Sequence, residues 1–99
     1  MDYRIIWSPE ALTHLEQLVY FISQDNPAAA AKLGNTIVEK ALLLSKFPRL
    51  GKIFREAECD TLREIPVPPY SIFYEINDGD TRVEILAIHH GARQEPEIQ

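Results

Sequence analysis

The chain has 99 residues, of which 45% are hydrophobic and 25% charged, with a formal net charge of -5 at pH 7. This composition is ordinary for one globular domain, so we treat residues 1–99 as a single domain. No apolar run approaches the roughly 18 residues that cross a bilayer, and no long apolar stretch at the N-terminus suggests a secretory signal. The lone cysteine, Cys59, allows neither an intrachain disulfide nor a cysteine-based zinc cage. We expect a cytoplasmic protein without a membrane partner.

The negative charge lies entirely in the second half of the chain. Residues 1–50 hold five basic and five acidic side chains, whereas residues 51–99 hold five basic and ten acidic ones. Proteins that grip nucleic-acid phosphates depend on Lys and Arg. A broad nucleic-acid-binding surface is therefore not expected. The charge balance is still compatible with a local basic strip.

The first half predicts a strand and a helical hairpin. Residues 3–7 are β-branched and aromatic, which is typical of a short strand. Ser8-Pro9 then resembles a helix N-cap with proline at the first helical position, and Asn26-Pro27 repeats this signal, with Asp25 as the other candidate cap. Apolar residues recur every three or four positions after both signals. Two helices joined by about four residues should pack as an antiparallel hairpin.

After Gly51 the apolar period changes to two, which indicates strands. We predict strands at residues 61–65, 71–76 and 82–89, with a turn at 77–80 in which Asp78-Gly79 are the residues that tolerate positive φ. Alternation places four side chains of the last strand on one face: Val83, Ile85, Ala87 and His89. The prolines at 66, 68 and 69 must lie in a loop or at a sheet edge. The predicted order is β-α-α-β-β-β, an α+β fold with the helical hairpin on one face of a small antiparallel sheet.

Residues 89–93, His-His-Gly-Ala-Arg, are the most unusual local feature of the sequence. Imidazole suits acid–base work near neutral pH, and a guanidinium can clamp a phosphate. His90 and Arg93 could lie near one another around Gly91. The alternative is a strand end with exposed polar side chains.

Two further sets are candidates for binding. Lys52, Arg55 and Arg63 could line one groove, or could be surface charges among neighbouring acidic residues. Tyr70 and Tyr74 share a strand face and could stack on bases or pack in the core. We find no phosphate-binding loop, dinucleotide fingerprint, serine elbow or metal-ligand pattern, so no cofactor or metal is expected.

The ordered series of short motifs resembles the RelE/ParE toxins of bacterial type II toxin–antitoxin, or plasmid stabilisation, modules. The matching segments lie at residues 7–11, 20–22, 25–30, 47–52, 63–65, 70–74 and 88–93. This resemblance covers nearly the whole chain. It implies a growth-inhibiting toxin and a cognate antitoxin whose flexible C-terminal segment wraps the toxin surface.

The resemblance leaves two mechanisms. RelE-like members cut messenger RNA on the ribosome with basic and aromatic groups, whereas ParE-like members inhibit DNA gyrase by binding. This chain departs from the nuclease pattern, because residues 66–69 are Pro-Val-Pro-Pro where nucleases tend to carry an arginine, and no aromatic residue follows Tyr74. The acidic net charge also disfavours docking into ribosomal RNA.

We therefore expect a ParE-like toxin that acts by binding gyrase rather than by catalysis. The alternatives are a ribosome-dependent endoribonuclease and a detoxified homologue that only binds its antitoxin. As a nuclease, the chain would use Arg63, His90 and Arg93. The residues expected to contact antitoxin or target are Lys52, Arg55, Arg63, Tyr74, His90 and Arg93.

Overall fold

The computed structural model describes residues 2–54 and 60–91. Three of the residues singled out above, Arg55, Cys59 and Arg93, lie outside these ranges. The elements follow the order β1 (Arg4–Trp7), α1 (Pro9–Ser23), α2 (Pro27–Leu43), β2 (Lys52–Ile53), β3 (Leu62–Val67), β4 (Tyr70–Asn77) and β5 (Arg82–His90). The predicted order is confirmed, with the two-residue strand β2 added. Among the described helices, none is long and apolar enough to span a membrane.

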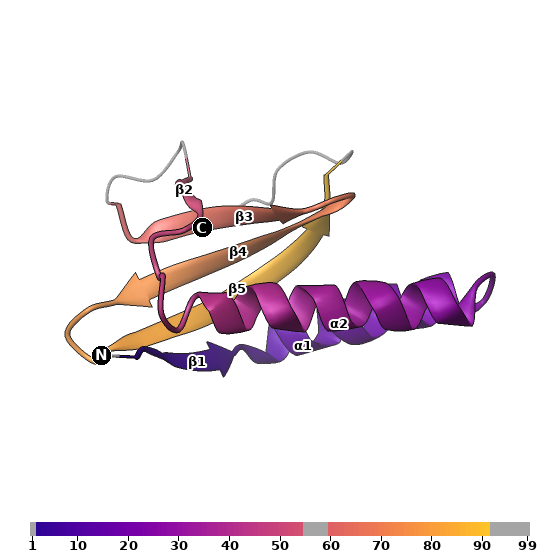
Figure 1. Ribbon diagram of the computed structural model, residues 1–99, viewed down its shortest axis with the longest axis horizontal. Coiled ribbons are helices and arrows are strands. Elements are labelled where there is room, and N and C mark those ends of the chain that lie inside the picture. Colours follow the sequence, from indigo (N-terminus) through magenta and orange to yellow (C-terminus); the bar gives the residue numbers. More distant parts are fainter. Residues whose placement is uncertain (1, 55–59, 92–99) are drawn as a thin grey trace.

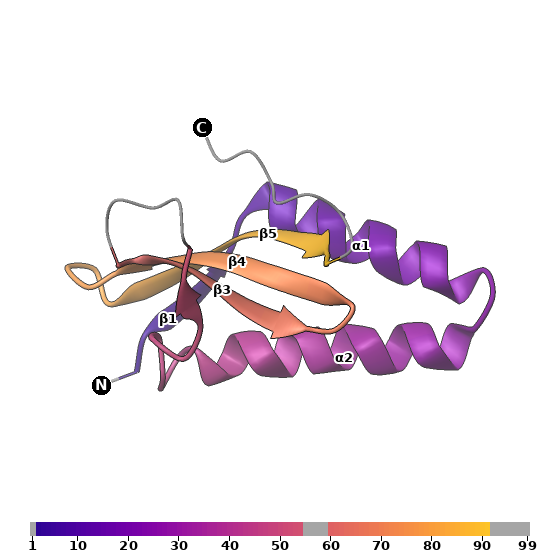
Figure 2. The ribbon, with the colours of Figure 1, turned by 90° about the horizontal axis from the view of Figure 1, so that it is seen from above.

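The helical hairpin lies against one face of a five-stranded sheet with the order β1-β5-β4-β3-β2 (Figure 1). Strands β2 to β5 pair antiparallel, whereas β1 pairs with β5 in parallel. The predicted sheet was wholly antiparallel, and no local sequence signal indicates which strand receives β1. Seen from above, the end of α1 and the start of α2, where the two helices are joined, extend past the strands (Figure 2).

Both predicted N-caps are confirmed. The Ser8 hydroxyl accepts a 3.0 Å hydrogen bond from the Ala11 amide, and the Asn26 side chain accepts one of 3.0 Å from Ala29. These bonds satisfy amide groups that have no partner within the first helical turn. Both helices carry proline in their first turn.

The core fills the space between the helices and the sheet. Its fully buried members include Ala11, Ile37, Leu44, Ile72, Tyr74, Val83 and Ile85. Burial of such side chains contributes roughly 25 cal/mol per Å² of apolar surface. Gly34 lets the helices approach, because a Cβ there would lie 3.3 Å from Val19 on α1. Trp7 packs against the core from the edge strand β1.

A β-bulge breaks the predicted alternation of β5. Tyr74 pairs with Ile85 and Phe73 with Ala87, so Leu86 is an extra residue in β5. The bulge moves Ile88 onto the buried face at 4% exposure, so the prediction that Ala87 and His89 share a face with Ile85 was wrong. Alternation assumes one residue per pairing position, and a bulge adds one.

Strand β3 and the β4–β5 turn also refine the predictions. Pro66 lies within β3, beyond the two residues of β3 that pair with β2, and therefore on the sheet edge. The positive φ of the β4–β5 turn falls on Thr81, at 51°, and on none of the glycines. Asp78 and Gly79, which the sequence indicates as tolerant of positive φ, therefore do not adopt it.

Candidate functional site

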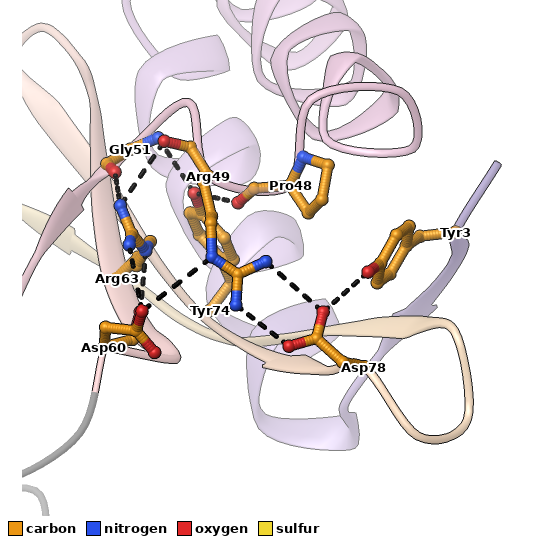
Figure 3. A network of polar contacts seen from close by, with 8 residues as sticks. All are labelled: Tyr3, Pro48, Arg49, Gly51, Asp60, Arg63, Tyr74 and Asp78. Atoms are coloured by element: carbon orange, nitrogen blue, oxygen red, sulfur yellow. Dashed lines mark hydrogen bonds and ion pairs between the residues drawn. The ribbon is translucent and has the colours of Figure 1, made fainter. Parts of the chain in front are cut away.

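A network of polar contacts joins the α2–β2 connection (residues 44–51) to the sheet (Figure 3). Its centre is Tyr74, which is 0% exposed. The Tyr74 hydroxyl accepts a 2.9 Å hydrogen bond from the Gly51 amide and donates one of 2.8 Å to the Pro48 carbonyl. Burial raises the pKa of this phenol. Because its ring is enclosed, Tyr74 fixes the connection from below and offers no stacking surface.

Arg63 holds the same connection from β3. Its guanidinium donates hydrogen bonds to the carbonyls of Gly51, at 2.9 Å, and Asp60, at 2.8 Å, and a longer one of 3.4 Å to Arg49. Only 11% of the Arg63 side chain is exposed. Arg63 therefore uses its Nε and Nη1 donors on backbone carbonyls of its own chain, and its Nη2 lies 4.0 Å from the Asp60 carboxylate. A phosphate would have to compete with these contacts for the guanidinium.

Arg49 links the connection to the β4–β5 turn. Its guanidinium makes hydrogen bonds of 3.3 and 2.9 Å with the two carboxylate oxygens of Asp78, which also accepts a 2.6 Å bond from the Tyr3 hydroxyl (Figure 3). The Arg49 hydrogen bonds, and then that of Tyr3, lower the pKa of Asp78 to about 2. Conversely, the Asp78 carboxylate raises the pKa of Arg49 and of Tyr3. No local motif indicated this trio, because its members lie far apart in the sequence.

The second candidate region is a cleft of about 390 Å³ between α1 and the end of β5. Three imidazoles and a phenol are among its lining groups, which are His14, Gln17, Leu18, Phe21, Tyr70, Ile88, His89 and His90. The His90 ring meets Tyr70 edge-on at 5.1 Å between centroids, and the His89 ring meets His14 at 5.0 Å. Within the described residues, no Lys or Arg lines this cleft.

Sequence reasoning missed His14, which belongs to the same cleft. Its Nδ1 accepts a 3.2 Å hydrogen bond from the Ile88 amide. Strand β1 pairs with β5 only as far as Ile85. Beyond that point, the His14 side chain of α1 provides the hydrogen-bond acceptor for the β5 backbone. Because Nδ1 is the acceptor, the proton of the neutral ring lies on Nε2. The spacing of His14 among the polar residues of an amphipathic helix gave no signal of this role.

The structure does not bring the described nuclease candidates together. Arg63 pairs with Tyr74, and His90 pairs with Tyr70, four residues away along β4. At about 3.3 Å per residue, the two positions are separated by roughly 13 Å along the strand. Lys52 lies in β2, where its ammonium is 4.0 Å from Glu64 and its side chain is 75% exposed. The described residues contain no cluster of three or more His, Cys, Asp or Glu able to hold a metal ion.

Comparison with known proteins identifies the family. The model of the ParE toxin of the type II toxin–antitoxin system parDE matches residues 5–95. The chain belongs to this toxin family. The predicted membership is confirmed, and the protein is therefore a type II toxin of the ParE/RelE group.

Individual relatives agree with this assignment. The putative toxin Y4kP of Sinorhizobium fredii is 32% identical over 97 residues, covering 96% of this chain and 95% of that protein. A chain of the RelBE2 toxin–antitoxin complex of Mycobacterium tuberculosis is 28% identical, with a TM-score of 0.66 and coverage of 91% of this chain and 99% of that one.

Two further structures share the ParE/RelE toxin fold at lower identity. A chain of the chromosomal ParDE system of P. aeruginosa is 20% identical, with a TM-score of 0.73 and coverage of 90% and 96%. A mutant of the E. coli toxin RelE in the free state is 15% identical, with a TM-score of 0.68 and coverage of 91% and 84%.

Proposed function

We propose that this ParE/RelE toxin inhibits DNA gyrase by binding it and performs no chemistry on it. The observation that carries the proposal is the state of Arg63. Its guanidinium is bound to the carbonyls of Gly51 and Asp60, and its position is roughly 13 Å along the sheet from His90. Phosphodiester cleavage needs an acid–base group and a cation within reach of one phosphate. The match to the ParE model supports the same mechanism.

A supercoiling assay tests this proposal. Purified toxin is titrated into DNA gyrase acting on relaxed plasmid DNA, and we expect inhibition at micromolar toxin or below. The His90→Ala variant is the control for chemistry, and it should inhibit as well as the wild type. Absence of inhibition at these concentrations, with growth arrest intact in cells, would overturn the proposal.

We further propose that a cognate antitoxin neutralises the toxin by covering its acidic sheet face and the helical hairpin. Glu75 and Glu84 stand directly opposite one another in β4 and β5, and like charges in this arrangement repel. On the helices, large apolar side chains are exposed at Leu12, Val38 and Leu42. A partner segment with Lys or Arg beside apolar anchors complements both features.

The antitoxin is sought as the product of the neighbouring reading frame. Its association rate with the toxin should fall as salt rises, because charge steering is screened. In the Glu75→Gln, Glu84→Gln double variant this salt dependence should weaken. A rate that is insensitive to salt in the wild type would contradict the charge argument.

One observation favours a second candidate function, a ribosome-dependent endoribonuclease. The cleft beside β5 gathers the imidazoles of His14, His89 and His90, and imidazole is a common acid–base group. This function predicts cuts in messages held on programmed ribosomes, and loss of those cuts in His90→Ala. Intact messages in that assay would remove it.

A further inference from the structure

An apolar surface lies at the end of α2 and on the connection that follows it. Leu43, Phe47 and Leu50 are 44%, 57% and 50% exposed. The three residues lie on successive turns of the chain. The Phe47 amide donates a hydrogen bond to the Leu43 carbonyl, and the Leu50 amide donates one to the Phe47 carbonyl, each at 3.0 Å. We call Leu43, Phe47 and Leu50, with the flanking Lys46 and Lys52, the Phe47 surface. Grouped exposed apolar side chains with a polar rim are typical of an interaction site.

The backbone under this surface is held firmly in place. The buried Tyr74 hydroxyl bridges Pro48 and Gly51, and Arg63 donates to the Gly51 carbonyl (Figure 3). Gly51 lies so close to β3 that a Cβ would be 2.6 Å from the Glu64 carbonyl oxygen. A surface fixed before binding loses less conformational freedom when a partner docks. The exposed side chains are therefore presented by a rigid support.

The charges around the surface indicate the chemistry of its partner. The side chains of Lys46 and Lys52 are 69% and 75% exposed, and their ion pairs with Asp2 and Glu64 are long, at 3.7 and 4.0 Å. Such exposed pairs contribute little, so the ammonium groups can exchange them for a partner's carboxylates at small cost. The complementary partner carries apolar side chains flanked by acidic residues.

We propose that the Phe47 surface is where the toxin engages its protein target, through an apolar and acidic patch on that target. This inference rests on the proposed function for the identity of the target, gyrase. The antitoxin segment inferred above is basic, because it complements Glu75 and Glu84. The lysines of the Phe47 surface would repel the basic part of such a segment, so we assign this surface to the target. An antitoxin on the adjoining part of the hairpin, at Leu42, would then neutralise the toxin by blocking the approach of the target to this surface.

The test measures gyrase inhibition and growth arrest with the same set of variants. The Phe47→Ala, Leu50→Ala double variant should inhibit supercoiling about tenfold less strongly than the wild type or worse, and should lose growth arrest. Tyr20→Ala is the matched control, since this aromatic side chain is 68% exposed on α1; it should behave as the wild type. Urea denaturation of each variant should show a cooperative transition like that of the wild type, which separates a loss of docking from a loss of the fold.

A charge variant tests the acidic character of the target. Inhibition by the wild type should weaken as salt rises, and Lys46→Gln, Lys52→Gln should inhibit less and depend less on salt. Unchanged potency and salt dependence in this variant would overturn the acidic partner.

The outcomes separate the two proposals. If the wild type inhibits gyrase and the Phe47, Leu50 double variant inhibits equally, the docking inference is wrong and the proposed function stands. If the wild type arrests growth without inhibiting gyrase, the proposed function fails. The docking inference is then decided by whether the double variant still arrests growth. Loss of arrest in the double variant supports target docking at this surface, whereas retained arrest overturns it. If the wild type neither inhibits gyrase nor arrests growth, both proposals fail.

Discussion

The guanidinium of Arg49 donates two hydrogen bonds, at 3.3 and 2.9 Å, to the two carboxylate oxygens of Asp78. This pair joins the α2–β2 connection to the β4–β5 turn, and the Tyr3 hydroxyl adds β1 to the same carboxylate. Three segments that meet only in the folded chain are thus fastened at one point. The Phe47 surface is built on one of these segments.

The Asp78 carboxylate should make stability depend on pH in the acid range. Its ordinary pKa is 3.8, and its hydrogen bonds lower the folded-state pKa to about 2. A lowered folded pKa gives stabilisation that is fully present above the unfolded value and is lost as pH falls through the folded one. Urea denaturation between pH 6 and pH 2 should therefore show stability falling below about pH 4.

Two variants isolate the contribution of this carboxylate. Asp78→Asn removes the titrating group, and Arg49→Gln removes the main cause of the lowered pKa. Both variants should show a flatter stability profile than the wild type between pH 4 and pH 2. An identical profile in all three proteins would show that Asp78 does not gain its stabilisation from Arg49.

Gly51 should tolerate no side chain. A Cβ there would lie 2.6 Å from the Glu64 carbonyl oxygen and 2.7 Å from the Tyr74 hydroxyl, so the sheet or the connection must shift. We expect Gly51→Ala to lower the free energy of unfolding by about 1–3 kcal/mol or more. Gly79→Ala is the matched control, because the nearest atom lies 3.5 Å away. Equal stability of the two variants would contradict the close approach.

The buried Tyr74 hydroxyl should contribute more to the free energy of unfolding than an exposed tyrosine hydroxyl does. Tyr74→Phe leaves the Gly51 amide and the Pro48 carbonyl without their partner, and we expect a loss of about 1–3 kcal/mol in the free energy of unfolding. Tyr20→Phe removes the same hydroxyl from a side chain that is 68% exposed and should change stability little. Urea denaturation measures both, and a similar small effect at Tyr74 would count against the bridge.

His14 should protect the amide of Ile88 from exchange with solvent. Replacing it in His14→Leu removes the Nδ1 acceptor, so the amide at the edge of β5 loses its bond to α1. We expect exchange of the Ile88 amide hydrogen to accelerate by about tenfold or more, as local opening becomes easier. Gln17→Leu, on the same helix, serves as the control. Unchanged Ile88 exchange in His14→Leu would show that α1 does not seal this edge.

Local signals predicted the elements but not every detail of their assembly. Ser8 and Asn26 cap the helices as expected, because capping depends on residues three positions apart. The parallel pairing of β1 with β5 joins the two ends of the described fold, and its register is set by packing. The bulge at Leu86 likewise escaped notice, since an extra residue looks like ordinary alternation in a sequence of apolar residues.

The sequence indicated which residue types belong to the candidate site, but not how their side chains are arranged. The sequence singled out Arg63, Tyr74 and His90 by residue type. It gave no sign that the first two serve the α2–β2 connection, because their partners are backbone carbonyls and an amide. Backbone groups are present at every position, so residue type cannot indicate which of them a side chain will bind.

Supercoiling of relaxed plasmid DNA by purified gyrase, measured beside message cleavage on programmed ribosomes, tests the central claim most directly. If the toxin acts by binding, the wild-type toxin and the His90→Ala variant should both inhibit supercoiling, and neither should cleave messages held on ribosomes. Cleaved messages that become intact in His90→Ala, with gyrase unaffected, would contradict the claim.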